Sequence, residues 1–156
     1  APMNLGVGAD GYVALERSWT VGDVVEVELP IESRFVEAHP RIESTRGCLA
    51  IERGPVVYCL EQADHPGVRV DDVEIDASVP LGAHWEQDRL DGVTVIRGTG
   101  FEPDISSWNR QLYRPAQLGR SQSRKHAELI AIPYYAWANR EPGAMRVWIP
   151  RAHVRV

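Results

Sequence analysis

Two cysteines are the first candidates for chemistry in this chain, and both lie in the stretch GCLAIERGPVVYCLE, residues 47–61. Cys48 and Cys59 flank a break at Gly54 and Pro55, so the stretch can be a reactive site, a disulfide-closed hairpin or a hairpin with inert thiols. Their separation does not match the CxxC spacing of redox sites. A nucleophilic cysteine needs a nearby positive charge that lowers its pKa, and only Arg53, at the turn, supplies one locally.

The register of this hairpin decides how the two thiols lie. Because Pro55 has no N–H, we expect a four-residue loop from Glu52 to Pro55, which places Cys48 opposite Cys59. One face then carries Leu49, Ile51, Val56, Tyr58 and Leu60, and the other carries Cys48, Ala50, Val57 and Cys59. Both faces are apolar, so we expect both to be covered. Opposed cysteines can form a cross-strand disulfide, but we favour buried free thiols because the chain shows no export signal.

The other residues with chemical potential do not form a recognisable catalytic or metal site. The five histidines are scattered, with no HxH or HExxH pair that would place two nitrogens on one metal. There is no GxSxG nucleophile motif. A glycosidase carboxylate pair is defined by separation in space, so no pair can be assigned from the sequence. We therefore assign no catalytic residue, no metal ligand and no cofactor to this chain.

A cluster of aromatic residues is the second concentrated feature, in IPYYAWANREPGAMRVW, residues 132–148. Tyr134, Tyr135 and Trp137 precede a turn that holds Asn139 and Arg140. Aromatic faces beside an amide and a guanidinium can bind a sugar, as at the rim of a substrate cleft. They can equally fill a core or a seam between domains, which is the interpretation that we favour.

The elements that would position these residues are short strands separated by frequent Gly, Pro and Asp turns. This pattern predicts an all-β fold, an antiparallel β-sandwich of jelly-roll-like type, in a single domain over residues 1–156. Residues 23–30 alternate clearly, with Val25, Val27 and Leu29 on one face. A loop is expected at roughly 99–125. The other expected strands are residues 11–19, 34–40, 47–52, 56–61, 68–76, 81–87, 92–98, 127–137 and 144–150.

Composition excludes several classes of function. A chain of 156 residues, 44% apolar and 25% charged, is long enough for a core without disulfides. A net charge of −5 gives no attraction for nucleic acid. No apolar run is long enough for a membrane span. The first residues lack a basic region followed by an apolar run, which favours the bacterial cytoplasm, although the chain can be an excised part of a longer protein.

The two stretches described above also carry a resemblance to a known family. GCLAIERGPVVYCLE and LIAIPYYAWANREPGAMRVWIP, preceded by GYVALERSWTVGDVVEVELP and VEAHP, resemble the C-terminal part of glycoside hydrolase family 127. That family includes β-L-arabinofuranosidases and was formerly labelled a domain of unknown function. The resemblance covers nearly the whole chain.

The resemblance implies a parent glycoside hydrolase whose catalytic domain is an N-terminal (α/α)₆ barrel with a zinc-bound cysteine nucleophile. Cys48 and Cys59 match the hairpin motif and not that nucleophile, so the zinc site is expected outside this chain. The expected partner is the missing barrel, which this accessory domain would brace, and we expect the chain alone to lack hydrolase activity. The alternative is an independent carbohydrate-binding module. An uncovered apolar patch would also favour a homodimer.

Overall fold

The computed structural model describes residues 5–115 and 123–152, and its regular elements are strands and short 3₁₀ helices. The 3₁₀ helices are η1 (Glu43–Thr45), η2 (Gln62–Asp64), η3 (Val70–Asp72), η4 (Ser106–Trp108) and η5 (Tyr134–Ala136). The strands are β1 (Ser33–Glu37), β2 (Cys48–Arg53), β3 (Val56–Glu61), β4 (Glu74–Ile75), β5 (Gly82–Glu86), β6 (Val93–Pro103), β7 (Arg124–Pro133), β8 (Met145–Arg146) and β9 (Ile149–Pro150).

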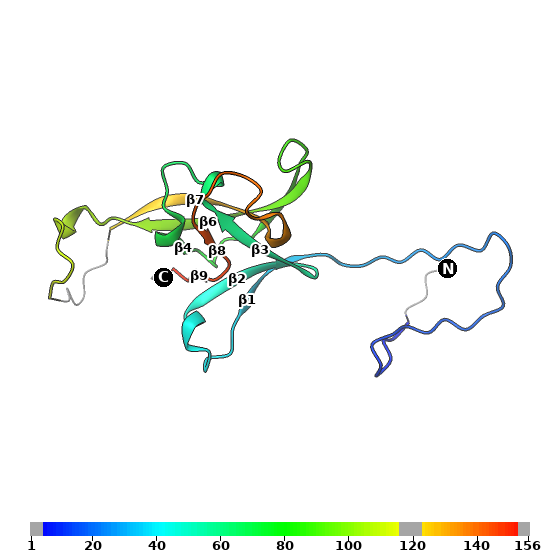
Figure 1. The fold of residues 1–156 in the computed structure, drawn as a ribbon. Coiled ribbons are helices and arrows are strands. Elements are labelled where there is room, and N and C mark those ends of the chain that lie inside the picture. The colour runs from blue at the N-terminus through cyan, green and yellow to red at the C-terminus, as the bar shows by residue number, and fades with distance from the viewer. Residues whose placement is uncertain (1–4, 116–122, 153–156) are drawn as a thin grey trace.

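The strands pair antiparallel in one curled sheet with the order β1-β2-β3-β7-β6-β4 (Figure 1). Outside this path, β5 pairs with β6, β8 with β3 and β9 with β2. Beyond β9, Arg151 forms a parallel bridge with Ile75 of β4, so the segment that pairs with β2 also reaches β4. The all-β antiparallel class predicted from the sequence is confirmed, and the jelly-roll connectivity stays a prediction.

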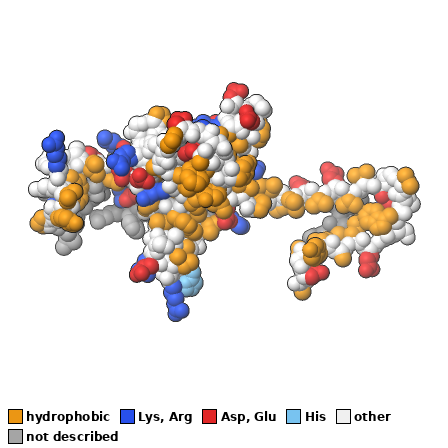
Figure 2. All heavy atoms as spheres, viewed as in Figure 1, with side chains coloured by type: hydrophobic (Ala, Val, Ile, Leu, Met, Phe, Trp, Pro, Cys, Tyr) orange, Lys and Arg blue, Asp and Glu red, His pale blue; other side chains and the backbone are white. Residues whose placement is uncertain are grey.

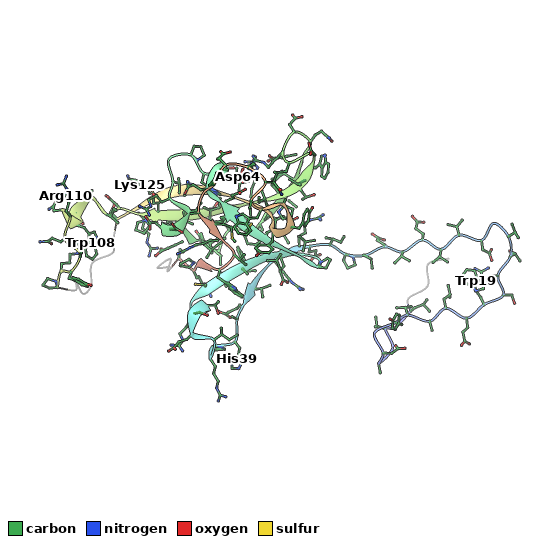
Figure 3. All side chains as sticks on the ribbon, viewed as in Figure 1. Trp19, His39, Asp64, Trp108, Arg110 and Lys125 are labelled. Carbon is green, nitrogen blue, oxygen red and sulfur yellow. The ribbon has the colours of Figure 1, made fainter. Side chains whose placement is uncertain are left out.

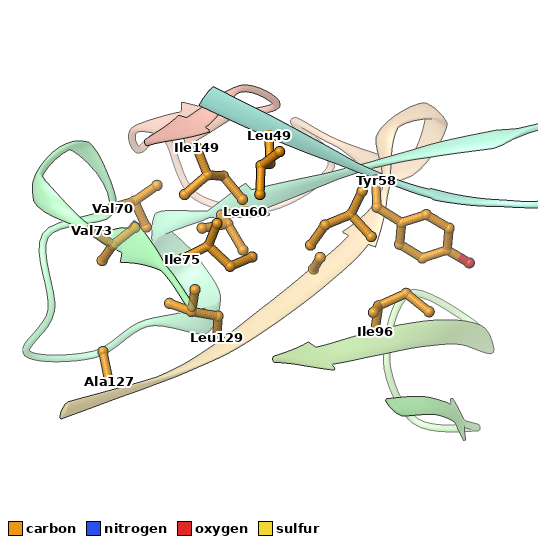
Figure 4. Close-up of a cluster of buried hydrophobic side chains, with 12 residues drawn as sticks. Leu49, Tyr58, Leu60, Val70, Val73, Ile75, Ile96, Ala127, Leu129 and Ile149 are labelled. Carbon is orange, nitrogen blue, oxygen red and sulfur yellow. The ribbon is translucent and has the colours of Figure 1, made fainter. Parts of the chain in front are cut away.

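The main core fills the inside of this curl, where side chains from strands far apart in sequence meet (Figure 4). Leu60, Ile75 and Ile96 are fully buried there. Tyr58 belongs to the same core and is 3% exposed. A second, smaller cluster contains Cys59, Val93, Val95 and Ile132. Neighbouring residues of a strand point to opposite faces, so β3 is covered on both sides. This confirms the prediction of a strand pair with two dry faces.

The predicted register of the β2–β3 hairpin is wrong by two residues. Ile51 lies opposite Tyr58 and Arg53 opposite Val56, which leaves a two-residue loop of Gly54 and Pro55. Gly54 has a φ of 56°, the positive value required at the first loop position of a tight hairpin. Pro55 takes the second position, from which no N–H is needed. The predicted face of each residue is unaffected, because a shift of two preserves the alternation.

Residues 5–32, which we call the N-terminal arm, extend away from the sheet (Figure 1). Two strands were expected here, over residues 11–19 and 23–30, and no strand is present within residues 5–32. Val25, Val27 and Leu29 are 55%, 70% and 69% exposed. The alternating pattern is real, but a strand also needs a partner for its N–H and C=O groups. The arm meets the sheet at its end, where the N–H of Gly54 donates to the carbonyl of Glu32 at 3.3 Å, and residues 11–19 and 23–30 pair with no strand among the described residues.

The β6–β7 pair is longer than the sequence predicts. The expected loop at 99–125 begins only after Pro103 and ends before Arg124, because β6 and β7 pair from Ile96 opposite Ala131 to Pro103 opposite Arg124. Gly98 and Gly100 lie in this pair, and glycines weaken a strand signal. The sequence of Asp91 and Gly92 before β6 predicts a tight hairpin with the preceding strand. β5 and β6 do form an antiparallel hairpin, but its connection spans residues 87–92, between the paired residues Glu86 and Val93, and is not tight.

Candidate functional site

The aromatic cluster lies on the turn that follows β7. Tyr134 and Trp137 stack with their ring centroids 6.0 Å apart and an angle of 20° between the planes. Tyr134, Tyr135 and Trp137 are 46%, 72% and 38% exposed. Three neighbouring aromatic side chains therefore face solvent, and they do not fill the core of this chain.

Arg140 points the other way, toward buried carboxylates at the end of β3. Its Nη1 donates to Oδ1 of Asp64 at 2.7 Å and its Nη2 to Oδ2 at 2.6 Å, while Nε donates to Oε2 of Glu61 at 3.2 Å. A second contact joins Nη2 to the same Glu61 oxygen. The Asp64 side chain is fully buried and that of Glu61 is 2% exposed. Figure 3 labels Asp64 within the body of the molecule. The bonds to Asp64, followed by those to Glu61, raise the pKa of Arg140.

The same carboxylates fix the backbone of the turn. The N–H of Ala138 donates to Oε1 of Glu61 at 3.3 Å, and Ala138 has a φ of 64°, an uncommon conformation for a residue with a side chain. The amide of Asn139 donates to the carbonyl of Ala136 at 3.0 Å. Asn139 and Arg140 therefore hold the turn in place, so that the aromatic side chains are presented on a rigid support.

The ion pairs continue from this turn to the β5–β6 hairpin. Arg89 pairs with Asp64 and, at 2.6 Å, with Glu86, whose other oxygen pairs with Arg97 at 2.9 Å. A pocket of about 510 Å³ opens between the two segments, lined by Arg140 and residues 86–90. Leu90, one of the lining residues, has a φ of 49°, which is uncommon for a residue with a side chain.

The expected strand over residues 127–137 ends early, because β7 stops at Pro133 and Tyr134–Ala136 form the 3₁₀ helix η5. Sequence reasoning grouped the three aromatic residues with Asn139 and Arg140, but it missed the residues that support them. Glu61 and Asp64 lie 79 and 76 residues before Arg140. The available signal was weak: Glu61 ends an apolar strand on the same face as Cys59, where a carboxylate needs a partner. No local pattern identifies that partner as Arg140.

The two cysteines are free thiols and do not face each other. Cys48 lies opposite Pro150 of β9, and Cys59 lies opposite Ile132 of β7. Burial raises the pKa of the Cys59 thiol to about 12, and the nearby carboxylates of Glu61 and Asp64 also raise it. Cys59 is therefore a poor nucleophile and a poor metal ligand.

One residue of the β2–β3 hairpin, Tyr58, lies near the exposed aromatic residue Tyr135. Burial raises the pKa of Tyr58, against an opposing effect of the Arg53 guanidinium, and Tyr135 is close enough to contribute. Arg53, Gly54 and Pro55 form the end of the β2–β3 hairpin, and Tyr58 packs in the main core.

The zinc that the family resemblance implies for parent enzymes does not fit these residues. Among the described residues, no group of three or more His, Cys, Asp or Glu side chains lies close enough to hold a metal ion. Glu61 and Asp64, the carboxylates nearest Cys59, are already bound by Arg140.

No helix in residues 5–115 and 123–152 is long and apolar enough to cross a membrane.

Comparison with known proteins places this arrangement in a family. Residues 33–150 match the model of the glycoside hydrolase family 127 C-terminal domain. A non-reducing end β-L-arabinofuranosidase of Bifidobacterium longum subsp. longum is 36% identical over 145 residues, which cover 89% of this chain and 21% of that protein. The chain thus spans about a fifth of the length of this curated relative.

Solved structures give the same result. A family 127 β-L-arabinofuranosidase of Geobacillus stearothermophilus T6 is 38% identical with a TM-score of 0.71, over 79% of this chain and 19% of that one. A family 127 β-arabinofuranosidase is 33% identical with a TM-score of 0.80, over 96% of this chain and 22% of that one. A further glycoside hydrolase is 33% identical with a TM-score of 0.82, over 97% and 24% of the two chains. This chain therefore belongs to glycoside hydrolase family 127, as its C-terminal domain.

Proposed function

We propose that this chain is the non-catalytic accessory part of a β-L-arabinofuranosidase-type glycoside hydrolase and that it braces the catalytic domain. One observation carries the proposal: nearly the whole chain matches such enzymes, but it accounts for only about a fifth of their length. The charged side chains that are best placed for chemistry, those of Glu61, Asp64 and Arg140, neutralise one another below the surface. Their arrangement supports a structural role.

The exposed face of the turn is the proposed seam with the catalytic domain. Tyr134, Tyr135 and Trp137 present a large aromatic surface to water, and such surfaces on a domain are typical of interaction sites. The turn is held by hydrogen bonds to Glu61, so little conformational freedom would be lost when a second domain covers it. This rigidity favours a permanent contact.

Hydrolysis assays on two proteins test the non-catalytic role. The isolated 156-residue chain and the full-length enzyme that contains it are each incubated with 4-nitrophenyl β-L-arabinofuranoside. We expect turnover by the full-length enzyme only. Turnover by the isolated chain above the uncatalysed rate would contradict the proposal.

Substitution of the aromatic face tests the seam. The double variant combines Tyr135→Ser with Trp137→Ala in the full-length enzyme. We expect it to lower the melting temperature of the enzyme, because the catalytic domain loses part of its contact with this domain. The matched control is Trp85→Ala on β5, which removes an aromatic side chain that is 63% exposed outside the cluster. An equal effect of the control and the double variant would argue against a seam at the turn.

An independent carbohydrate-binding module is the second candidate, and the stacked pair of Tyr134 and Trp137 favours it. Because the two rings stack on each other, a sugar ring would pack against the outer face of one of them. This function predicts that arabinofuranose oligosaccharides quench the tryptophan fluorescence of the isolated chain, and that Trp137→Ala abolishes the quenching. A seam predicts no saturable change.

A further inference from the structure

The pocket between the β5–β6 connection and the turn after β7 has walls that a buried carboxylate holds together. Its volume of about 510 Å³ lies within the range of about 300–1,000 Å³ that small-molecule sites span. Residues 86–90 line one side and Arg140 lines the other. Oδ1 of Asp64 accepts hydrogen bonds from Nη1 of both Arg89 and Arg140, and the Asp64 side chain is fully buried. The fold therefore sets the separation of the two walls before any ligand binds.

The backbone of the β5–β6 connection is strained where it borders the pocket. Leu90, Asp91 and Gly92 follow one another with φ values of 49°, 61° and 101°. The N–H of Gly92 donates to the carbonyl of Arg89 at 2.9 Å, which closes a turn behind the lining residues. Strained conformations that the surrounding structure enforces cluster at ligand sites and active sites. The connection is therefore a candidate binding segment on grounds that are independent of the pocket.

Two lining side chains offer hydrogen-bond donors whose positions are already fixed. Nε of Arg89 donates to Oε2 of Glu86 at 2.6 Å, and its Nη1 donates to Asp64. A guanidinium has five N–H groups, so Arg89 can donate to a ligand as well. The indole N–H of Trp85 donates to Oε1 of Gln87 at 3.3 Å, and the NH₂ group of this amide can donate in turn.

Asp88 and Leu90 complete the lining with an acceptor and an apolar surface. The Asp88 side chain is exposed and its carboxylate can accept several hydrogen bonds, whereas Leu90 is half-buried. A sugar ring needs this combination, because its hydroxyls both donate and accept and its faces carry C–H groups. The chemistry of the lining therefore fits a polyhydroxylated ring.

The charge around the pocket favours a neutral ligand. The four charged lining residues balance one another: Glu86, Asp88, Arg89 and Arg140. The buried carboxylates of Glu61 and Asp64 lie behind Arg140, and Figure 2 shows acidic side chains in red at the upper end of the body, where the green β5–β6 connection of Figure 1 projects. These carboxylates disfavour an anion, and the two guanidiniums of the walls disfavour a cation.

We propose that this pocket binds one residue of a neutral sugar, with Gln87, Asp88 and Arg89 as the hydrogen-bonding groups and Leu90 against the C–H face of the ring. That the sugar is an arabinofuranose residue rests on the proposed function, whereas its neutral polyhydroxylated chemistry rests on the pocket alone. Arg140 belongs both to the pocket and to the turn of the proposed seam, so a bound sugar would lie next to that seam. Neither ring of the stacked aromatic pair lines the pocket.

Saturation-transfer difference NMR on the 156-residue chain with methyl β-L-arabinofuranoside tests the site. We expect saturable binding that is at least about 10-fold weaker in Asp88→Ala, which removes a charged acceptor. The matched control is Glu141→Ala, which removes an exposed carboxylate beside Arg140 that does not line the pocket and should leave the affinity unchanged. Both side chains are exposed, so neither change should unfold the chain. No saturable binding by the unaltered chain, or equal affinity of the two variants, would overturn the inference.

Two further comparisons separate the pocket from the aromatic face. Trp137→Ala should bind the arabinofuranoside as the unaltered chain does, and loss of binding in this variant would overturn the inference by placing the sugar on the stacked rings. A methyl glucuronide, which carries a carboxylate, should bind more weakly, and tighter binding would contradict the preference for a neutral ligand. The hydrolysis assay on the isolated chain is independent of these readouts, so failure of the proposed function and failure of this inference can be told apart.

Discussion

Arg140 and Asp64 form a two-point contact across 76 residues of sequence, with both guanidinium Nη atoms within 2.7 Å of the two carboxylate oxygens. This pairing joins the turn after β7 to the 3₁₀ helix η2 after β3. Because the Asp64 side chain is fully buried, the pair is shielded from solvent on one side. The contact therefore fixes the position of the exposed aromatic face relative to the sheet.

Replacing Arg140 by methionine is expected to lower the free energy of unfolding by about 3–5 kcal/mol, since it leaves buried carboxylates without their main partner. Urea denaturation followed by circular dichroism measures this change. The control is Arg34→Met, which removes an exposed pair with Glu52 at 3.0 Å and should cost less than about 1 kcal/mol. Similar losses in the two variants would contradict the structural role of Arg140.

Mild acid is expected to destabilise the domain through His65. Its Nε2 accepts the N–H of Ile130 at 3.1 Å, which requires a neutral ring, and burial lowers its pKa below the ordinary value of 6.5. Asp64 opposes this shift, whereas Arg89 and Arg140 support it.

The direction of the pH effect follows from that pKa shift. Above pH 6.5 the ring is neutral in both states and its contribution is fully present, whereas below pH 6.5 the unfolded state binds the proton first. Stability should therefore fall as the pH drops from 6.5 toward the lower pKa of the folded state. Unfolding free energies measured from pH 8 to 5 check this, and His65→Gln should flatten the curve in that window.

Gly100→Ala is expected to destabilise β6 by about 2–3 kcal/mol, because an added Cβ would lie 2.5 Å from the carbonyl oxygen of Glu74 and 2.6 Å from Cδ1 of Leu129. Gly98→Ala on the same strand is the control. Its nearest neighbour is the flexible end of Leu81 at 3.3 Å, so a change within about 1 kcal/mol is expected. Chemical denaturation of both variants gives the comparison.

The two thiols should differ in reactivity toward a disulfide reagent such as DTNB. Cys48 is half-buried and should react in the folded chain, whereas Cys59 is inaccessible and its pKa is raised to about 12. We expect one thiol per chain to react rapidly with DTNB in buffer and two to react in urea. The Cys48→Ser variant should show no rapidly reacting thiol in buffer. Equal reaction rates of the two thiols in buffer would contradict the burial of Cys59 on β3.

Most strands of the sheet could be predicted from the sequence, because their apolar side chains pack against other parts of this chain and therefore alternate with polar ones. Face assignments for β2 and β3 were correct, since Tyr58 and Leu60 lie in one core and Cys59 in the other. Their register was not, because hydrophobic alternation repeats every two residues and cannot distinguish a shift of two. Only the conformation of Gly54 and Pro55 decides it.

Two other parts of the structure depend on information outside any local pattern. The strand expected at residues 23–30 is absent, because these residues pair with no strand within residues 5–115 and 123–152. The support of the aromatic turn comes from Glu61 and Asp64, which are brought to Arg140 only by the pairing of β3 with β7. A single sequence identifies the polar residues of the turn but not the distant charges that neutralise them.

The bridge from Arg151 to Ile75 has a consequence for synthesis of the chain on the ribosome. Residues 149–152 join β2 to β4, and they are translated after the other strands. Until they emerge, Leu49 and Ile75 lack the cover that Ile149 provides in the complete core. The domain is thus completed late in translation, by a short segment that closes over strands made about 75–100 residues earlier.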